Sequence, residues 1–318
     1  MSASKKKLDV IVIGELNVDI ILSSIDSFPS IGKEILANYM SVTLGSSSAI
    51  FASNLSSLGT IVGFIGKVGD DIFAKLVLDS LQSKNVDTSH ILRSASVPTG
   101  ATIVLNYDQD RANITFPGAM NDLHIEDIDF AFLSTARHMH FSSCFMQPGI
   151  KNDITELFRK AKELGLTTSL DTQWDPEEKW DLPLENLLPW VDVFLPNFQE
   201  FKFLTRADTI EEGINKIKQF ANYIIIKNGS NGSIGWDGKN IIYQPAFKND
   251  KVVDCIGAGD SFNAGYIMDY INNKPFKKCL ETGSLIGAIN TTRAGGTGAF
   301  ENTDLIREIS RERFNLLF

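Results

Sequence analysis

Cysteine is scarce in this sequence of 318 residues, with three cysteines at long spacings and no Cys-x-x-Cys pair. That usage excludes a disulfide framework and a zinc ribbon, and it agrees with a reducing compartment. Long apolar runs are missing too, since none approaches the roughly 18 residues needed to cross a bilayer. The apolar stretch after Lys5–Lys7 stops at Gly14 and is too short for a signal-peptide core. A soluble, cytoplasmic protein is therefore expected.

Positive charge is also in deficit, because 30 Lys and Arg stand against 39 Asp and Glu, a formal net charge of −9. Nucleic acid and anionic membranes repel such a chain at long range unless a local basic patch compensates, and none is visible. The expected partners are therefore small molecules, with no nucleic acid and no membrane. Hydrophobic residues make up 43% of the chain, enough to bury a sizeable core.

The sequence does contain a regular alternation of short apolar, β-branched runs with longer segments of helical period. The runs are Val10–Ile13, Ile61–Ile65, Thr102–Leu105, Val193–Leu195 and Tyr223–Ile226, and the helical segments are Ser48–Leu58, Asp71–Ser83, Ile150–Leu164, Ile210–Phe220, Ser261–Ile271 and Pro275–Thr291. This alternation predicts a mainly parallel sheet with helices on both faces, a three-layer α/β/α sandwich. No linker or repeat divides the chain, so residues 1–318 are expected to form a single domain.

Two regions interrupt this rhythm. Residues 17–44 and 98–116 are strand-like on both sides of turns and contain no convincing helix. Strands outside the crossover pattern predict a small separate sheet, and such a sheet beside a large α/β core can act as a lid. Ordinary surface hairpins are the alternative.

His138 and His140 form the most suggestive metal pattern, because side chains two apart on a strand point to one face. No third ligand is apparent nearby, and a structural zinc site needs four. The preferred interpretation is a strand whose histidines lie near its polar end.

The most informative segment is Asp254–Gly265, which follows a strand-like stretch and runs into a helical pattern. Gly257 and Gly259 allow a tight turn with unobstructed amides, which suits a helix N-terminus that receives an anion. Asp260 is either a helix cap or a base that accepts a proton from a substrate hydroxyl while the amides stabilise a transferred phosphoryl group. A dinucleotide fingerprint fails because Phe262 stands where its third glycine belongs, and no Walker-type loop occurs.

This segment resembles the C-terminal signature of the ribokinase-like carbohydrate kinases, the pfkB family. Further similar segments follow the family's order and cover nearly the whole chain: Gly14–Asp19, Gly45–Gly59, Gly66–Asp71, Pro98–Gly100, Pro117–Ala119, Asn197–Glu200, Lys227–Gly232 and Thr292–Gly295. The resemblance implies a ribokinase-like fold and an enzyme that uses ATP and Mg²⁺ to phosphorylate a hydroxyl of a small sugar or sugar-like acceptor.

The resemblance also implies roles for individual residues. Asp260 would be the catalytic base, and the amides of Gly257, Ala258 and Gly259 would form the anion hole. The implied contacts of ATP are Asn197, Lys227, Gly229, Gly232 and Asn290, and those of the acceptor are Asn17, Asp19, Gly45 and Asp260. Glu200 would hold Mg²⁺ through water, and Asp254 would be a contact of K⁺, which many relatives hold near the anion hole.

Simpler roles stay open for several of these residues. Asn197 and Glu200 share one face at a helix start, where capping would explain both. Gly229 and Gly232 suit a plain turn, and so does Asp254.

The N-terminal signature departs from the family pattern at two positions, since Ser46 replaces its second glycine and Ile50 its asparagine. Isoleucine cannot hydrogen-bond a sugar, so Ile50 either alters the acceptor pocket or belongs to the helix core. Pro117 stands where acidic-sugar kinases commonly carry arginine, which favours a neutral acceptor. The alternatives are a nucleoside kinase, with Phe116 or Phe51 stacking on the base, and a catalytically silent binding protein on the same fold.

The strands of the lid also bear on oligomeric state. Their unpaired edges can pair between two subunits, as in some relatives, and a homodimer through the lid is expected.

Overall fold

The computed structural model describes residues 7–107 and 110–316 of the chain. Its main sheet contains β1 (Leu8–Ile13), β4 (Val62–Gly69), β5 (Asp87–Ser94), β8 (Ala136–Ser142), β9 (Thr167–Asp171), β10 (Val193–Phe194), β11 (Tyr223–Lys227), β12 (Ser233–Trp236) and β13 (Ile241–Gln244). Their order is β13-β12-β11-β10-β9-β8-β1-β4-β5. The strands from β11 to β5 are parallel to their neighbours, whereas β12 and β13 form an antiparallel extension.

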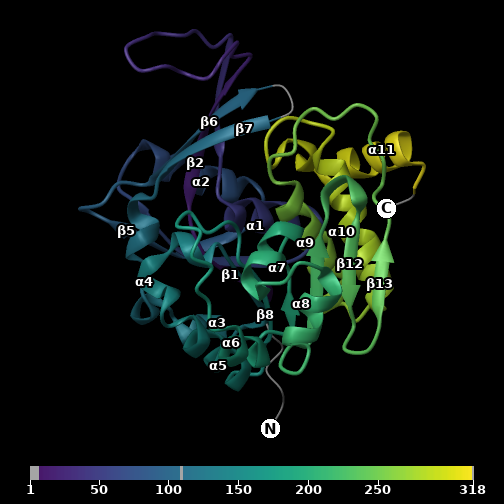
Figure 1. Cartoon of the computed structure of the whole chain (residues 1–318). Coiled ribbons are helices and arrows are strands. Elements are labelled where there is room, and N and C mark those ends of the chain that lie inside the picture. Colours follow the sequence, from purple (N-terminus) through teal and green to yellow (C-terminus); the bar gives the residue numbers. More distant parts are fainter. Residues whose placement is uncertain (1–6, 108–109, 317–318) are drawn as a thin grey trace.

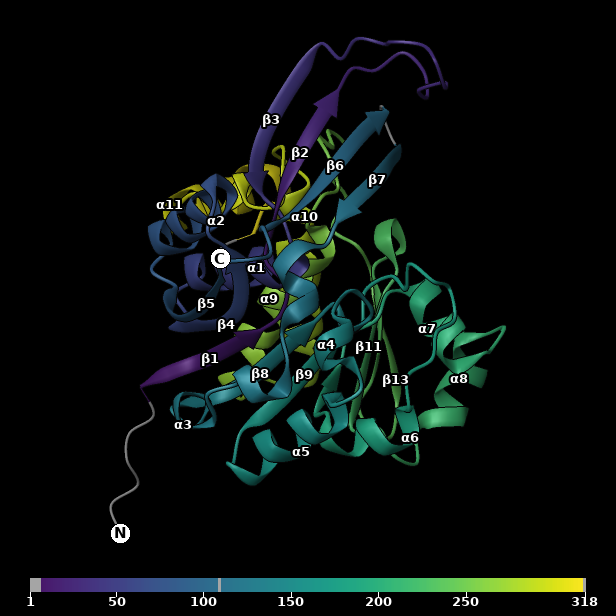
Figure 2. The ribbon, with the colours of Figure 1, turned by 90° about the vertical axis from the view of Figure 1, so that its left-hand side faces the viewer.

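Helices cover both faces of this sheet (Figure 1). They are α1 (Ser47–Ser57), α2 (Ile72–Ser83), α3 (Phe130–Leu133), α4 (Pro148–Lys151), α5 (Ile154–Glu163), α6 (Leu184–Leu187), α7 (Phe198–Thr205), α8 (Ile210–Ile217), α9 (Ala258–Ile271), α10 (Phe276–Asn290) and α11 (Thr303–Phe314). Figure 2 shows α1, α2, α9 and α10 on one side of the sheet and α5 to α8 on the other. Within residues 7–107 and 110–316, no helix combines the length and the apolarity that a membrane span requires.

Strand β1 packs against a hydrophobic core on each face of the sheet. Val10 and Val12 join a buried cluster with Phe51 of α1. Ile11 and Ile13 point the other way and join the cluster that includes the apolar side of α5. A strand buried on both faces reads as a continuous apolar run, as this one does. The prediction of a three-layer α/β/α fold is confirmed.

A smaller sheet projects from one end of the large one (Figures 1 and 2). It consists of β2 (Asn17–Ser23), β3 (Tyr39–Leu44), β6 (Gly100–Tyr107) and β7 (Asp110–Phe116) in the order β3-β2-β6-β7. The separate sheet predicted from residues 17–44 and 98–116 is therefore confirmed, while its action as a lid stays a prediction. Because β1 continues through residues 14–16 into β2, this sheet lies at the carboxyl ends of the parallel strands. Ligands of open α/β sheets bind at that end.

One predicted helix is interrupted. Residues 150–164 were expected to form a single helix, but α4 ends at Lys151 and α5 begins at Ile154. Asn152 and Asp153 lie between them, and such short polar side chains compete for backbone hydrogen bonds and favour helix ends over interiors. The prediction of one continuous helix is wrong, because the amide of Asp153 donates to the carbonyl oxygen of Ile150 three residues back (3.0 Å), a tighter turn than that of an α-helix.

His138 and His140 are both fully buried on β8. The Oγ of Ser169 lies 2.7 Å from Nε2 of His138 and 2.7 Å from Nδ1 of His140. The other two ring nitrogens lie 2.8 Å from the hydroxyls of Thr167 and Ser142. All four nitrogens are thus bound to hydroxyl groups, which is a core role. Among the described residues, no three His, Cys, Asp or Glu side chains are grouped so that they could hold a metal ion.

Candidate active site

The N-terminus of α9 carries the predicted anion hole. Gly257 is the N-cap and has a φ of 73°, in the left-handed region that glycine adopts without strain. Ala258, Gly259 and Asp260 form the first turn, where helix N–H groups lack intrahelical partners. The amide of Ala258 already donates a hydrogen bond to the carbonyl oxygen of Cys255 (3.3 Å). The turn is therefore suited to an anion, with the Asp260 side chain in the same turn.

Two of the predicted site residues shape the loop before α9. The Asp254 carboxylate accepts hydrogen bonds from the amides of Ile256 (2.9 Å) and Gly295 (2.7 Å), which ties two loops together. Asn290 is fully buried, donates to the carbonyl of Ile256 (2.6 Å) and accepts from Ser261 Oγ (2.9 Å). Their predicted contacts with K⁺ and ATP stay predictions.

Ile50 lies behind this loop. It is 3% exposed. A Cβ on Gly296 would stand 2.4 Å from its Cδ1, and one on Gly257 would stand 3.0 Å from its Cγ2. Its neighbour Phe51 is fully buried and stacks on His140, with ring centroids 3.8 Å apart. Of the two roles predicted for Ile50, burial favours packing, here between α1 and the anion-hole loop.

Ser46 keeps a glycine-like backbone although it is not glycine. Its φ is 69°, which costs a residue with a side chain about 1 kcal/mol or more. The hydroxyl offsets this cost, because it donates to the carbonyl of Glu15 (2.5 Å) and accepts from the amide of Ala49 (3.1 Å). The Glu15 carboxylate accepts from Ser47 and Ser48, and burial raises the pKa of Glu15. The start of α1 is thus already occupied by a protein carboxylate.

The predicted acceptor residues converge at the base of the smaller sheet. A Cβ on Gly45 would lie 2.3 Å from Oδ1 of Asp19 and 2.9 Å from Oδ1 of Asn17. Asn17 donates to Thr102 (2.7 Å), which contacts Thr115 (3.1 Å) on the next strand. The Oδ1 of Asn17 is buried and has no hydrogen-bond partner among residues 7–107 and 110–316. A ligand hydroxyl would satisfy that oxygen.

An apolar contact joins the two parts of the site. Ile21 of β2, Val104 of β6 and Ile256 of the anion-hole loop form a small buried cluster. Because Asp19 lies two residues before Ile21 on the same strand, its side chain is on the face that meets this loop. The predicted acceptor residues and the first turn of α9 therefore lie beside the same apolar contact.

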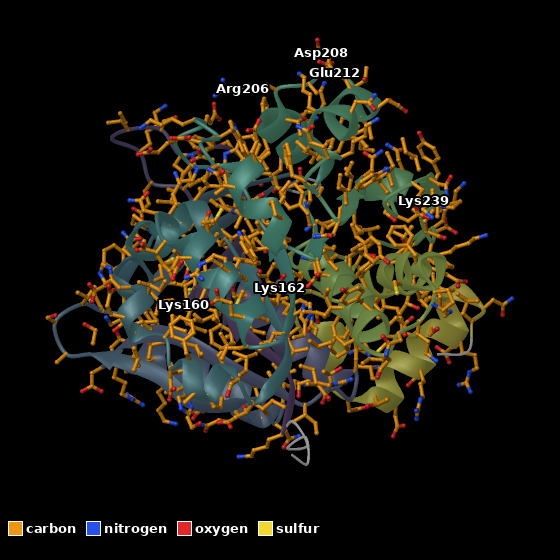
Figure 3. The ribbon with its side chains drawn as sticks, turned by 90° about the horizontal axis from the view of Figure 1, so that it is seen from below. Lys160, Lys162, Arg206, Asp208, Glu212 and Lys239 are labelled. Atoms are coloured by element: carbon orange, nitrogen blue, oxygen red, sulfur yellow. The ribbon has the colours of Figure 1, made fainter. Side chains whose placement is uncertain are left out.

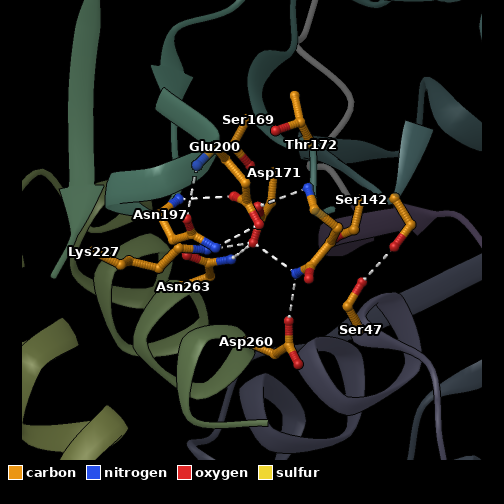
Figure 4. A network of polar contacts seen from close by, with 12 residues as sticks. Ser47, Ser142, Ser169, Asp171, Thr172, Asn197, Glu200, Lys227, Asp260 and Asn263 are labelled. Atoms are coloured by element: carbon orange, nitrogen blue, oxygen red, sulfur yellow. Dashed lines mark hydrogen bonds and ion pairs between the residues drawn. The ribbon is translucent and has the colours of Figure 1, made fainter. Parts of the chain in front are cut away.

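Asp171 is at the centre of the polar network in Figure 4. It ends β9 and is fully buried. Its Oδ2 is bound by Lys227 Nζ (2.5 Å), Asn263 Nδ2 (2.5 Å) and Gln173 Nε2 (3.0 Å). Gln173 Nε2 also lies 3.0 Å from Oδ1 of Asp260. The predicted base is thereby connected to a buried ion pair.

Asn197 and Glu200 form a capping box at the start of α7. Asn197 Oδ1 accepts from the amide of Glu200 (2.9 Å), and Glu200 accepts from the amide (2.8 Å) and Nδ2 (2.6 Å) of Asn197. Burial, and after it the negative charge of Asp171, raises the pKa of Glu200 to about 7. Helix capping therefore accounts for this geometry.

The remaining predicted ATP contacts follow β11. Lys227 Nζ would lie 3.7 Å from a Cβ on Gly259, so it stands close to the anion hole. Gly229 and Gly232 have φ values of 53° and 91° in the turn to β12. A Cβ on Gly232 would lie 2.0 Å from the carbonyl oxygen of Gln244, so the turn itself requires that glycine. Their contact with ATP stays a prediction.

The charges of the site fit a divalent cation. Asp171, Glu200 and Asp260 lie close enough for the charges of the other two to raise the pKa of Glu200, and Lys227 is the cation beside them. Oxygen ligands in a region of net negative charge suit Mg²⁺, which keeps part of its water shell. No group of three His, Cys, Asp or Glu side chains that could hold a metal ion directly occurs in the described part of the chain.

A separate hollow of about 740 Å³ lies at the opposite, amino-terminal edge of the sheet. It contains none of the predicted site residues. Its Arg137 is held by Asp9 (2.7 Å) and by the carbonyl oxygen of Ile271 (3.1 Å). Figure 3 shows this lower face, where charged side chains such as Lys160 and Glu212 project outward. The hollow is therefore not part of the candidate site.

Sequence patterns missed Asp171, Gln173 and Asn263. β9 reads Thr-Thr-Ser-Leu-Asp and has no apolar run, because the face with Ser169 meets the buried histidines, while on the other face only Leu170 joins an apolar core. A polar residue at the end of a short β-branched stretch, directly before a turn, is the signal that would have found Asp171.

Known proteins resemble this chain in sequence and in fold. Residues 7–303 match the model of the pfkB family carbohydrate kinases. A 5-dehydro-2-deoxygluconokinase of Lacticaseibacillus casei is 27% identical over 316 residues, 94% of this chain and 94% of that protein. The structure of Arabidopsis thaliana ribokinase complexed with ribose and ATP has a TM-score of 0.81 at 22% identity, covering 95% of this chain and 98% of that one. A ribokinase from Thermotoga maritima has a TM-score of 0.82 at 24% identity, with 95% and 98% covered. The chain belongs to the pfkB family of carbohydrate kinases, as its motifs predicted.

Proposed function

We propose that this sugar kinase transfers the γ-phosphoryl group of ATP to a hydroxyl of a small sugar or sugar-like acceptor. One observation carries the proposal, namely the convergence of three groups at the carboxyl edge of the sheet. The first turn of α9 with Asp260, the acidic pair Asp171 and Glu200, and the polar face with Asn17 and Asp19 meet there.

In this mechanism Asp260 takes the proton of the acceptor hydroxyl. The hydroxyl oxygen bonds to the γ-phosphorus, and the bond from that phosphorus to the bridging oxygen of ADP breaks. Asp19 and Asn17 orient the acceptor, since a carboxylate and an amide oxygen both accept hydroxyl hydrogen bonds. The amides of Gly257 to Asp260 stabilise the charge on the transferred group.

Glu200 and Asn197 would hold Mg²⁺ through its waters, and Mg²⁺ when bound neutralises phosphate oxygens. Lys227, beside Gly259, would contribute further positive charge. For K⁺, the proposed oxygens are backbone carbonyls of residues 254–256 and 292–299, which Asp254 ties together. Replacement of potassium by a large organic cation should lower activity, and unchanged activity would count against this part.

We infer that the smaller sheet closes over the acceptor. The buried cluster of Ile21, Val104 and Ile256 already joins this sheet to the anion-hole loop, and it is the contact about which the rest of the sheet would close. Exclusion of water there would suppress hydrolysis of ATP. The true acceptor should then be the ligand that protects residues 17–44 and 98–116 from proteolysis.

The experiment is a panel of neutral sugars, acidic sugars and nucleosides with ATP and Mg²⁺, read as ADP release. Turnover should occur with a neutral sugar, and Asp260→Asn should lower kcat by about 10² to 10⁴-fold with ATP affinity retained. Near wild-type turnover by folded Asp260→Asn would overturn the role of Asp260. Thermal shifts by sugars without any turnover would support a silent binding protein instead.

A further inference from the structure

Gln173 joins the two aspartates that the site depends on, Asp171 and Asp260. Both aspartates are labelled in Figure 4. Its Nε2 lies 3.0 Å from Oδ2 of Asp171 and 3.0 Å from Oδ1 of Asp260. A carboxamide nitrogen carries two N–H groups, so each carboxylate receives one of them. The side chain therefore bridges the end of β9 and the first turn of α9.

The backbone of Gln173 is held in an uncommon conformation. Its φ is 57°, and a residue other than glycine stays there only where its surroundings impose it. Asp175 fixes the loop that follows, since it accepts from the amides of Glu177 (3.0 Å) and Trp180 (2.7 Å). Trp180 is buried and stacks on Phe203 of α7, with centroids 5.0 Å apart. The loop thus presents Gln173 from a rigid support.

Asp171 supplies a fixed reference point for this contact. It is fully buried and bound by Lys227, which leaves its carboxylate little freedom. Asn263, one turn after Asp260 on α9, donates to the same Oδ2. Asp171 is therefore tethered to α9 twice, directly through Asn263 and through Gln173 to Asp260.

We propose that Gln173 is a positioning residue that aims the Asp260 carboxylate at the acceptor by anchoring it to the Asp171–Lys227 ion pair. The inference rests on the proposed role of Asp260 as the base. A hydrogen bond from a neutral amide fixes the rotation of the carboxylate, and a base must be held in one orientation towards the hydroxyl whose proton it takes. The neutral amide of Gln173 lies between the carboxylates of Asp171 and Asp260 and adds no positive charge. The site therefore keeps the negative charge that suits Mg²⁺.

The test is Gln173→Met, which removes both donors and keeps a similar length. We expect kcat to fall roughly 10- to 100-fold, as for a displaced catalytic group, with acceptor KM, ATP affinity and melting temperature near wild type. Gln173→Glu, which is isosteric but lacks the amide donors and adds a charge, should lose at least as much. The matched control is Glu178→Met, because Glu178 is exposed in the same loop with a φ of 53°, and it should keep wild-type kcat.

A double variant separates positioning from general damage. In the Asp260→Asn background, Gln173→Met should cost little further activity, because the group it aims is already gone. A full additional loss in that background would overturn the proposal. So would wild-type kcat in both folded Gln173 variants while Asp260→Asn is impaired. Wild-type activity of Asp260→Asn would overturn the proposed function itself, which distinguishes the two failures.

Discussion

Asp171 and Lys227 form a buried ion pair between the carboxyl ends of β9 and β11, the two strands on either side of β10. Oδ2 and Nζ are 2.5 Å apart, and the side chains are 0% and 10% exposed. Little water reaches such a pair. If one side chain is removed, water cannot replace it, and the charge of the other side chain stays uncompensated.

Lys227→Met should therefore destabilise the protein by about 3 to 5 kcal/mol. Urea unfolding measures the effect, and Asp171→Asn with Lys227→Met should recover part of it. Lys75→Met, which breaks an exposed pair with Asp79, is the control and should change stability by less than about 1 kcal/mol. A Lys227→Met protein as stable as wild type would contradict the uncompensated charge.

Ile50→Asn should destabilise the fold rather than redirect the acceptor. The new amide would be buried against Gly257 and Gly296, where the isoleucine now packs. A buried polar group without a partner, together with lost apolar contact, costs about 2 to 4 kcal/mol. Ile50→Val should cost only about 1 kcal/mol. An Ile50→Asn protein of unchanged melting temperature with a new sugar preference would show instead that residue 50 lines the acceptor pocket.

The buried histidines predict a loss of stability in acid. Burial lowers the pKa of His138 to about 3, and it lowers the pKa of His140 well below its usual value. The unfolded chain then binds more protons than the native one below about pH 6.5, so stability falls as pH drops below 6.5, by about 1.4 kcal/mol per pH unit for a histidine that stays neutral in the native state. Urea midpoints at pH 7, 6 and 5 measure this. His138→Gln should flatten the slope, whereas the exposed His124→Gln should not.

Asp19→Ala should raise acceptor KM and leave ATP affinity nearly unchanged. The loss of hydrogen bonds to a charged group costs about 1.5 to 3 kcal/mol, or roughly 10- to 150-fold in kcat/KM. Asp26→Ala, in the exposed segment after β2, is the control and should behave as wild type. If Asp19 merely satisfied local backbone donors, Asp19→Ala would lower the melting temperature and leave KM alone.

The outer face of the smaller sheet predicts a homodimer. Val42, Ile20, Ile103 and Ile114 are consecutive cross-strand neighbours, and apolar side chains on this face are exposed: Met40, Val42, Ile103, Ile114 and Phe116. Contiguous exposed apolar surface marks an interaction site. Sedimentation should give twice the chain mass, and Val42→Lys with Ile103→Lys should give monomers. Ile61→Lys, exposed elsewhere, should remain dimeric; a monomeric wild-type protein would remove the prediction.

Short sequence patterns predicted the elements whose structure depends on residues close to them in the chain. The apolar run of β1 and the glycines before Asp260 indicate a buried strand and an anion-binding helix start by themselves. Asp171 and Gln173 have no such pattern, because their roles depend on which strands become neighbours. Ile50 is similar, since nothing in α1 reveals that Gly296 from the far end of the chain will lie against it.

The buried contact of Ile21 and Val104 with Ile256 has a thermodynamic consequence. Ile256 lies next to the turn that would receive phosphate, whereas Ile21 and Val104 lie on the sheet that would receive the acceptor. A ligand that immobilises one side of this contact also restricts the motion of the other side. The second ligand then has less conformational entropy to remove when it binds. The two substrates should therefore bind with positive cooperativity, and by reciprocity each should increase the affinity of the other by the same factor.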